Sequence, residues 1–109
     1  MKIAMPTSDA KLDPHFGHCK NFTMIDVNDT DKTIIETKEI PAPPHEPGLL
    51  PAWLAEQGAN CVIAGGMGGR AIALLEEKNI SVILGAPLES PETLAKTYLD
   101  GSLREGKNS

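Results

Sequence analysis

The sequence predicts a small α/β domain whose sheet is partly parallel. Its 109 residues suffice for one hydrophobic core but not for a two-lobed nucleotide enzyme. The apolar runs "NCVIA" (60–64) and "ISVIL" (80–84) are typical of strands buried on both faces. A helical pattern separates them, so residues 60–84 indicate a right-handed βαβ unit. We expect residues 1–100 to form a single domain and residues 101–109 to form a frayed polar tail.

The first half of the chain is expected to supply three strands. Residues 2–5 predict a short strand that Pro6 closes, followed by a loop rich in Asp, Pro and Gly as far as about Lys20. Alternating side chains over 22–27 predict a second strand, and "NDTDK" supplies turn residues before the third strand, "TIIETKEI". Residues 21–40 therefore predict a β-hairpin.

The second half is expected to alternate helices with the two buried strands. Apolar spacing over 50–54 predicts a short helix that Gly58 stops, and a second helix runs from the glycine-rich turn to about Asn79. Ser90 is the expected cap of a last helix, with Pro91 in its first turn. The side chains expected to be buried on these helices are Leu50, Trp53, Leu54, Ala71, Leu74, Leu75, Leu94, Tyr98 and Leu99.

Charge and hydropathy exclude several classes of partner. The formal net charge is −5 and no cluster of Lys and Arg is present, so neither nucleic acid nor an anionic membrane is an expected partner. No stretch approaches the roughly 20 apolar residues that span a bilayer. The start, "MKIAMPTSDAKL", lacks the apolar run of a secretory signal. We therefore expect a soluble, cytoplasmic protein in which Cys19 and Cys61 remain thiols.

The stretch "DPHFGHCKNF" (13–22) gathers His15, His18 and Cys19, whose side chains are ligand types for zinc, copper, iron and iron–sulfur clusters. A closed zinc site needs four protein ligands, commonly with a C-x2-C pair, and the chain contains no such pair. The incomplete set suits an open or labile guest, such as a cluster that brings its own sulfides. The alternative is structural, with histidines that bind backbone groups and a cysteine that packs as a small hydrophobe.

Nearby residues extend this metal-site hypothesis. Lys20 and a protonated His18 are expected to lower the pKa of the Cys19 thiol, which favours ligation and nucleophilic attack equally. Cys61 lies in an apolar strand and is expected to be an inert core residue. His45, in the proline-rich loop "PAPPHEPG", is a candidate additional donor.

The turn "GGMGGRA" (65–71) follows a strand and opens a helix, and its spacing from Gly66 to Ala71 fits the dinucleotide pattern G-x-G-x-x-A. NAD would require an acidic residue at the end of the next strand, where Gly85 stands, so this reading is disfavoured. Exposed amides at a helix start suit any anion. The alternative is a tight turn that needs glycine for packing. Met67 is either a soft donor or a local packing contact.

Both motifs follow the carboxyl ends of predicted strands. Ligands of α/β sheets gather beyond these ends. If the first and fourth strands are parallel neighbours, the loops at 7–20 and 65–69 face each other across one crevice. The "PPHEPG" loop joins them if the third strand runs the same way.

Taken together, "DPHFGHCKNF", the following hairpin and "CVIAGGMGGRA" resemble the dinitrogenase iron–molybdenum cofactor biosynthesis family over about residues 2–100. The resemblance implies a three-layer α/β/α, ribonuclease H-like domain. Its mixed five-stranded sheet would have the order 3-2-1-4-5, with strand 2 antiparallel to the others. It also implies that His15, His18 and Cys19 bind metal. The cofactor-binding residues expected with them are Gly65, Gly66, Met67, Gly68 and Gly69.

The expected function is a non-catalytic carrier or scaffold for an iron–sulfur or iron–molybdenum cluster, with or without copper, that is exchanged with donor and acceptor proteins. Cys19 and nearby imidazoles would hold the cluster, and the amides of 66–69 would offset its negative charge. We expect a monomer or weak homodimer. The alternatives are a thiol enzyme with Cys19 as nucleophile and a metal-free interaction module. Nuclease activity is not expected, because "KIAMP" has no carboxylate and Asp9 and Asp13 belong to a loop.

Overall fold

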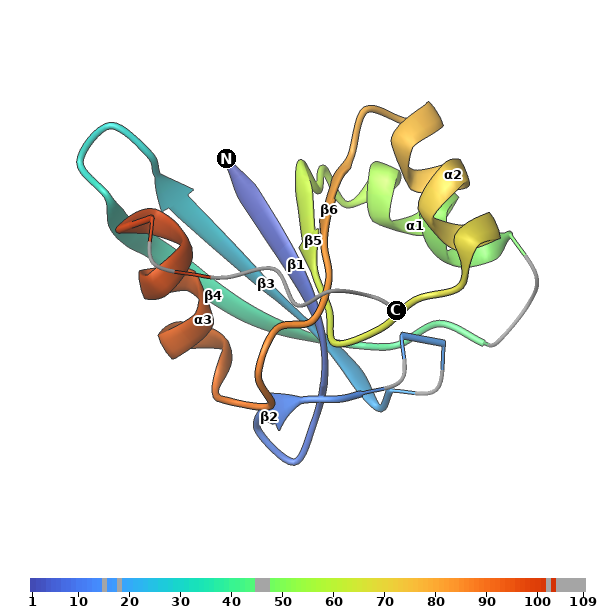
Figure 1. The fold of residues 1–109 in the computed structure, drawn as a ribbon, viewed down its shortest axis with the longest axis horizontal. Coiled ribbons are helices and arrows are strands. Elements are labelled where there is room, and N and C mark those ends of the chain that lie inside the picture. The colour runs from blue at the N-terminus through green and yellow to red at the C-terminus, as the bar shows by residue number, and fades with distance from the viewer. Residues whose placement is uncertain (15, 18, 45–47, 102, 104–109) are drawn as a thin grey trace.

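The computed structural model describes residues 1–14, 16, 17, 19–44, 48–101 and 103 (Figure 1). Among the described helices, none combines the length and the apolar character that crossing a bilayer requires. The elements in chain order are β1 (Lys2–Ser8), β2 (Lys11–Leu12), β3 (Asn21–Asn28), β4 (Thr33–Pro41), α1 (Leu49–Glu56), β5 (Cys61–Ile63), α2 (Gly69–Glu77), β6 (Ser81–Ile83) and α3 (Pro91–Leu99).

The strands form one mixed sheet in which β4-β3-β1-β5-β6 are successive neighbours. β3 runs antiparallel to β1 and β4, whereas β1, β5 and β6 are parallel. β1 and β5 are thus adjacent, with Ile3 beside Cys61. The predicted α/β class and mixed sheet are confirmed. The predicted number of strands is wrong, because the short strand β2 pairs with β1 where we expected continuous loop over 7–20.

β1 is longer than predicted, because Pro6 does not close it. The strand continues to Ser8, and Pro6 lies opposite Phe22 of β3. The Pro6 carbonyl accepts a hydrogen bond from the Asp13 amide at 2.8 Å, on the side of β1 that faces away from β3. Since the N–H and C=O of one strand residue point the same way, the missing proline N–H costs no bond to β3.

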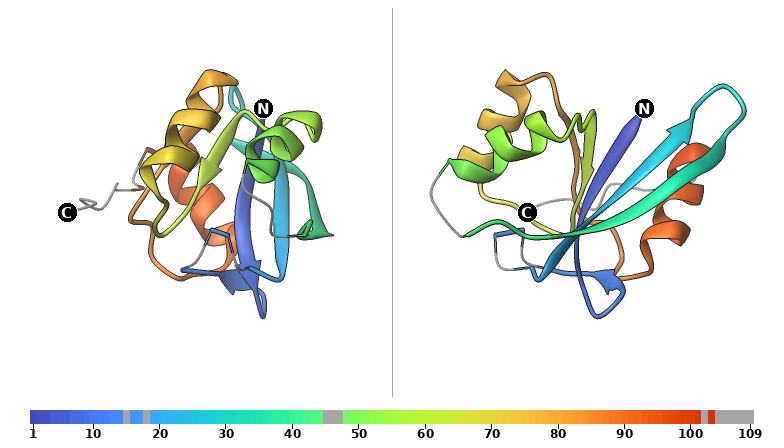
Figure 2. Two further views of the ribbon diagram at one scale, coloured as in Figure 1. Left: turned by 90° about the vertical axis from the view of Figure 1, so that its right-hand side faces the viewer. Right: turned by 180° about the vertical axis from the view of Figure 1, so that it is seen from behind.

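Helices cover both faces of the sheet, with α1 and α2 on one face and α3 on the other (Figures 1 and 2). Because successive side chains of a strand point to opposite faces, the sheet has one hydrophobic core on each face. Ala4 and Val62 belong to the core beneath α1 and α2, whereas Ile3 and Cys61 belong to the core beneath α3. All four side chains are fully buried. The sheet is therefore the middle layer of three, and Cys61 faces α3.

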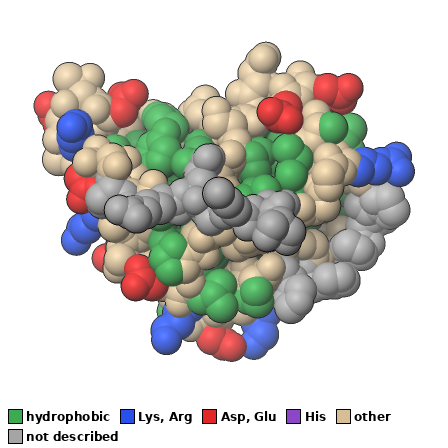
Figure 3. All heavy atoms as spheres, viewed as in Figure 1, with side chains coloured by type: hydrophobic (Ala, Val, Ile, Leu, Met, Phe, Trp, Pro, Cys, Tyr) green, Lys and Arg blue, Asp and Glu red, His purple; other side chains and the backbone are tan. Residues whose placement is uncertain are grey.

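The helix ends form as their local sequence predicts. The Ser90 hydroxyl accepts a hydrogen bond from the Thr93 amide at 3.4 Å, and Pro91 is the first residue of α3. Gly58 has a φ of +82° just after α1, the left-handed conformation that glycine adopts without strain. On the face shown in Figure 3, the described Lys and Arg side chains stand apart from one another rather than in one basic patch.

Candidate functional site

Loops that follow β2, β5 and β6 meet at Gly65. A Cβ atom placed on Gly65 would lie 3.6 Å from Pro14 Cα, 3.8 Å from Leu88 Cδ2 and 3.9 Å from the Ala86 carbonyl oxygen. The segment that carries the cysteine thus lies against the start of the glycine turn. This contact is the one that adjacent, parallel β1 and β5 lead us to expect.

Hydrogen bonds fix both ends of the segment from Asp13 to Lys20. The Ser8 hydroxyl donates to Asp13 Oδ2 at 2.6 Å and accepts from the Lys20 amide at 3.0 Å. The Lys20 carbonyl accepts from the amide of Ala42, immediately after β4, at 3.0 Å. The beginning of the loop after β4 therefore lies beside the segment from Asp13 to Lys20. One serine at the end of β1 bridges the two ends of the candidate metal-binding segment.

Cys19 is buried beneath this segment. Its side chain is 9% exposed, and Sγ donates to the Phe16 carbonyl oxygen at 3.6 Å. It belongs to the hydrophobic core that contains Phe16 and Phe22, and half-buried Met67 of the glycine turn packs against the same core. The thiol therefore belongs to a hydrophobic core against which the methionine at the tip of the glycine turn also packs.

The pKa of the Cys19 thiol is shifted in the direction opposite to our expectation. Burial, followed by the negative charge of Asp13, raises this pKa from 9.0 to about 11. Lys20 does not lower it, because Lys20 Nζ forms an ion pair with Asp9 at 3.2 Å at an exposed position. The group is therefore a neutral thiol near pH 7, and a metal that binds it must displace the proton.

This shift predicts a pH-dependent stability. Between pH 9 and about 11 the unfolded chain loses the Cys19 proton while the folded chain keeps it, so stability falls as the pH rises through this window. We expect the wild type to lose about 1–3 kcal/mol relative to Cys19→Ala over the window. Urea unfolding of both proteins measures this difference, because other titrating groups cancel. A difference that stays constant with pH would contradict the prediction.

The glycine turn is open. Gly65, Gly66, Gly68 and Gly69 all lie outside the left-handed region. A Cβ atom on any of the last three would meet no atom within 4 Å. The amides of 66–69 donate no hydrogen bond to any residue that the structure describes. Neither conformation nor packing requires these glycines, so the tight-turn alternative does not explain them. What their lack of side chains provides is access to free amides at the start of α2.

Of the other candidate metal ligands, the structure describes only some. His15, His18 and His45 lie outside the described residues. Cys61 is fully buried on the α3 face, across the sheet from Cys19, and neither cysteine forms a disulfide. Among the described His, Cys, Asp and Glu side chains, no group of three is arranged to hold a metal ion.

Two parts of the site around Gly65 are not predicted by the sequence analysis. One is the segment 84–90 after β6, which contacts Gly65 through Ala86 and Leu88. Its position after a third parallel strand is the sequence feature that could have indicated it. No sequence feature predicts the hydrogen bonds of Ser8 to Asp13 and Lys20, because they depend on β1 continuing past Pro6.

Similarity to known proteins extends over nearly the whole chain. The family model described as dinitrogenase iron-molybdenum cofactor matches residues 1–101. The uncharacterized protein MJ0580 of Methanocaldococcus jannaschii is 31% identical over 109 residues, covering 96% of this chain and 91% of the relative. The crystal structure of PH0822 superimposes with a TM-score of 0.89 at 26% identity, covering 99% of this chain and 96% of that chain.

A further solved structure, the apo form of the orange protein from Desulfovibrio gigas, has a TM-score of 0.73 at 21% identity. The match covers 96% of this chain and 92% of that chain. At this identity the likeness supports the fold alone.

Proposed function

The chain belongs to the dinitrogenase iron-molybdenum cofactor family, and from this premise we propose that it carries a metal cluster of the iron–sulfur or iron–molybdenum type. The cluster is its cargo, received from a donor protein and passed to an acceptor protein. The chain itself catalyses no reaction. Membership relates the protein to metallocluster binding or assembly, and the kind of cluster and the carrier role are the parts that we propose.

The observation that carries the proposal is the open glycine turn beside the Cys19 segment. Three glycines leave space where side chains would stand, and their amides make no hydrogen bond within the described residues. The turn touches Pro14, one residue before the histidine and cysteine motif begins. An anionic cluster with sulfide edges would accept hydrogen bonds from these amides while nearby soft ligands bind its metals.

The charge balance also supports a carrier. Many such clusters are anionic, and the protein has a formal net charge of −5, so neutral backbone donors are a suitable source of attraction. The raised pKa of Cys19 adds a cost, because metal binding must remove the thiol proton. These opposing contributions favour moderate affinity, which suits delivery.

The geometry of the described residues gives no support to a thiol enzyme. A nucleophilic cysteine needs a lowered pKa or an adjacent base, whereas Cys19 is buried with its pKa raised to about 11. Its described hydrogen-bond acceptor is a backbone carbonyl, which cannot take a proton from a thiol as a general base does.

We also propose that the domain is of the ribonuclease H-like type, which the strand order β4-β3-β1-β5-β6 supports. The sheet order does not bring nuclease chemistry with it. β1, "KIAMPTS", has no carboxylate to bind a metal ion.

Anaerobic reconstitution tests the proposed cargo. Incubation with iron and sulfide, or with copper and tetrathiomolybdate, is expected to give a charge-transfer absorption band that remains with the protein on gel filtration. Cys19→Ser and His18→Ala are expected to lose the band, because each removes one proposed ligand. Metal analysis of the same fractions gives the stoichiometry.

Cys61→Ala is the matched control, because it removes the other thiol from a fully buried site on the far face of the sheet. It should retain the band. Unchanged spectra in both Cys19→Ser and His18→Ala would reject the ligand assignment. Rapid alkylation of Cys19 near neutral pH, together with metal-free turnover of an acyl or phosphoryl substrate, would favour the enzyme instead.

A further inference from the structure

The edge strand β4 is exposed along nearly its whole length. Of its nine residues, only Ile34 and Ile40 are half-buried, and Ile35 is 63% exposed. β3 pairs with one side of β4, and no other described strand pairs with its outer side. Figures 1 and 2 show β4 at the open border of the sheet. A long edge strand of this kind is a template for pairing with another strand.

The register of the β3–β4 ladder determines which backbone groups point outward. The amide of Ala42 bonds to the Lys20 carbonyl, one step beyond the paired residues. In an antiparallel ladder, alternate residues direct their N–H and C=O toward the partner strand, and the others direct theirs away. The even-numbered residues of 36–40 therefore face β3. Thr37 and Glu39 present their backbone groups at the outer edge.

The charges on the two sides of Thr37 are opposite in sign, because Glu36 precedes it and Lys38 follows it. We propose that β4 pairs antiparallel with β4 of a second copy of this chain, with Thr37 opposite the partner's Thr37. This register joins outward-facing backbone groups. It also places Glu36 opposite Lys38 of the partner subunit, and Lys38 opposite Glu36 of the partner subunit.

Neighbouring registers are less favourable. A shift of one step in either direction sets Glu36 opposite the partner's Glu36, or Lys38 opposite the partner's Lys38, and like charges directly opposite one another are destabilising. Only the register centred on Thr37 sets both Glu36 and Lys38 of each copy opposite a residue of opposite charge. The charge pattern therefore selects a two-fold dimer and a single alignment.

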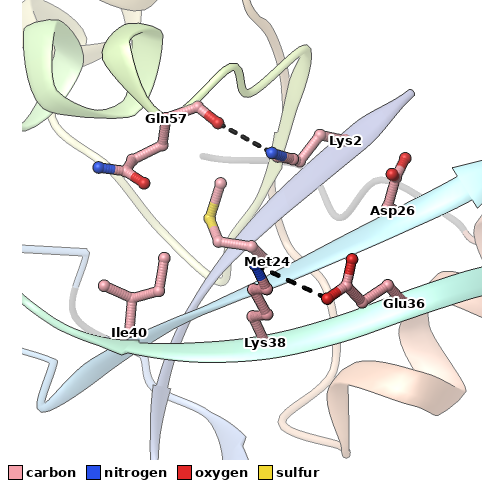
Figure 4. Close-up of a pocket in the computed structure, with 7 residues that line it drawn as sticks. All are labelled: Lys2, Met24, Asp26, Glu36, Lys38, Ile40 and Gln57. Atoms are coloured by element: carbon pink, nitrogen blue, oxygen red, sulfur yellow. Dashed lines mark hydrogen bonds and ion pairs between the residues drawn. The ribbon is translucent and has the colours of Figure 1, made fainter.

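The side chains are already suitably placed. Glu36 and Lys38 lie on the same face of β4, with Lys38 Nζ 3.7 Å from Glu36 Oε1, and both are more than half exposed. Figure 4 shows them among the residues that line a pocket, together with Met24 and Ile40. Pairing replaces one such exposed contact in each chain by two contacts between the chains, without any change of strand face.

The length of the ladder is limited on both sides. Pro41 has no N–H to donate, and the register between β3 and β4 shifts next to Asp26 and Val27. These features confine pairing to about residues 35–39. The dimer is therefore weak and depends on concentration. It stops at two chains, because the two-fold arrangement uses the β4 edge of both copies.

Sedimentation velocity over a series of concentrations of the full chain tests this proposal. The wild type is expected to shift from monomer to dimer as concentration rises. Glu36→Lys and Lys38→Glu should each weaken dimerisation by about tenfold or more, since each turns two attractive pairs into repulsive ones. A mixture of the two single variants, and the double variant with both changes, should recover wild-type dimerisation.

Glu76→Lys and Lys78→Glu are matched controls, because these two exposed residues at the end of α2 have the same spacing and charge. They should dimerise as the wild type does. A wild type that stays monomeric at every concentration would overturn the proposal, as would dimers that persist in both single variants. Recovery in the mixture without recovery in the double variant would overturn the register, because it would indicate that like residues lie opposite one another, either Glu36 with the partner's Glu36 or Lys38 with the partner's Lys38.

Discussion

A Gly68→Asp variant is expected to fold at least as stably as the wild type and to bind the cluster about tenfold or more weakly. Gly68 is the N-cap of α2, in extended backbone with φ −69°, and no side chain caps the helix. Aspartate is a better N-cap than glycine, and a Cβ atom there would meet nothing within 4 Å. Its carboxylate would compete for the amides and repel an anionic cargo.

Gly68→Asn is the matched control, since asparagine caps a helix equally well but carries no charge. Titration of each variant with the reconstituted cluster measures affinity, and urea unfolding measures stability. We expect Gly68→Asn to retain more binding than Gly68→Asp at equal stability. Equal binding by Gly68→Asp and the wild type would show that the helix start does not contact the cargo.

Replacing Phe22 with alanine is expected to lower the free energy of unfolding by about 3–5 kcal/mol. The Phe22 side chain is fully buried at the centre of an aromatic group. The Phe16 ring packs edge-on against it with centroids 5.8 Å apart, and the Trp53 ring lies at 5.5 Å. Truncation leaves a cavity between the Phe16 and Trp53 rings. It also removes the ring against which Phe16, in the segment containing Cys19, packs.

Urea unfolding followed by fluorescence measures this loss, because Trp53 is the single tryptophan and contacts Phe22. Leu88→Ala is a suitable control, since Leu88 is 50% exposed and its truncation should change stability by less than about 0.5 kcal/mol. A loss of similar size in both variants would contradict the assigned role of the aromatic group.

Features that depend on near neighbours in the sequence were predictable. Ser90 with Pro91 marks the start of α3, and Gly58 marks the stop of α1, because capping chemistry lies within a few residues. The hairpin followed from alternation and a polar turn, and residues 60–84 folded as the predicted βαβ unit. The meeting of the loops at Gly65 followed in turn from the parallel neighbours β1 and β5.

Features that depend on distant contacts were not predictable. The sequence predicts Pro6 as a strand breaker, but whether a proline breaks a strand depends on which side of β1 the missing N–H faces. From the sequence, Lys20 and a protonated His18 next to Cys19 predict a lowered pKa for its thiol. It rises because the fold buries the sulfur near Asp13 and turns Lys20 toward Asp9. Sequence proximity alone does not establish which charges a thiol meets.

The placement of the two sulfur atoms on opposite sides of the sheet makes oxidation a test of sample integrity. Cys61 neighbours Ile3 near the start of β1, whereas Cys19 lies two residues before Asn21, which is opposite Thr7, about 13 Å farther along that strand. Cysteines this far apart cannot be bridged without moving the backbone. An intramolecular disulfide found after exposure to air would therefore mark molecules that had unfolded, and a thiol titration before any reconstitution would reveal them.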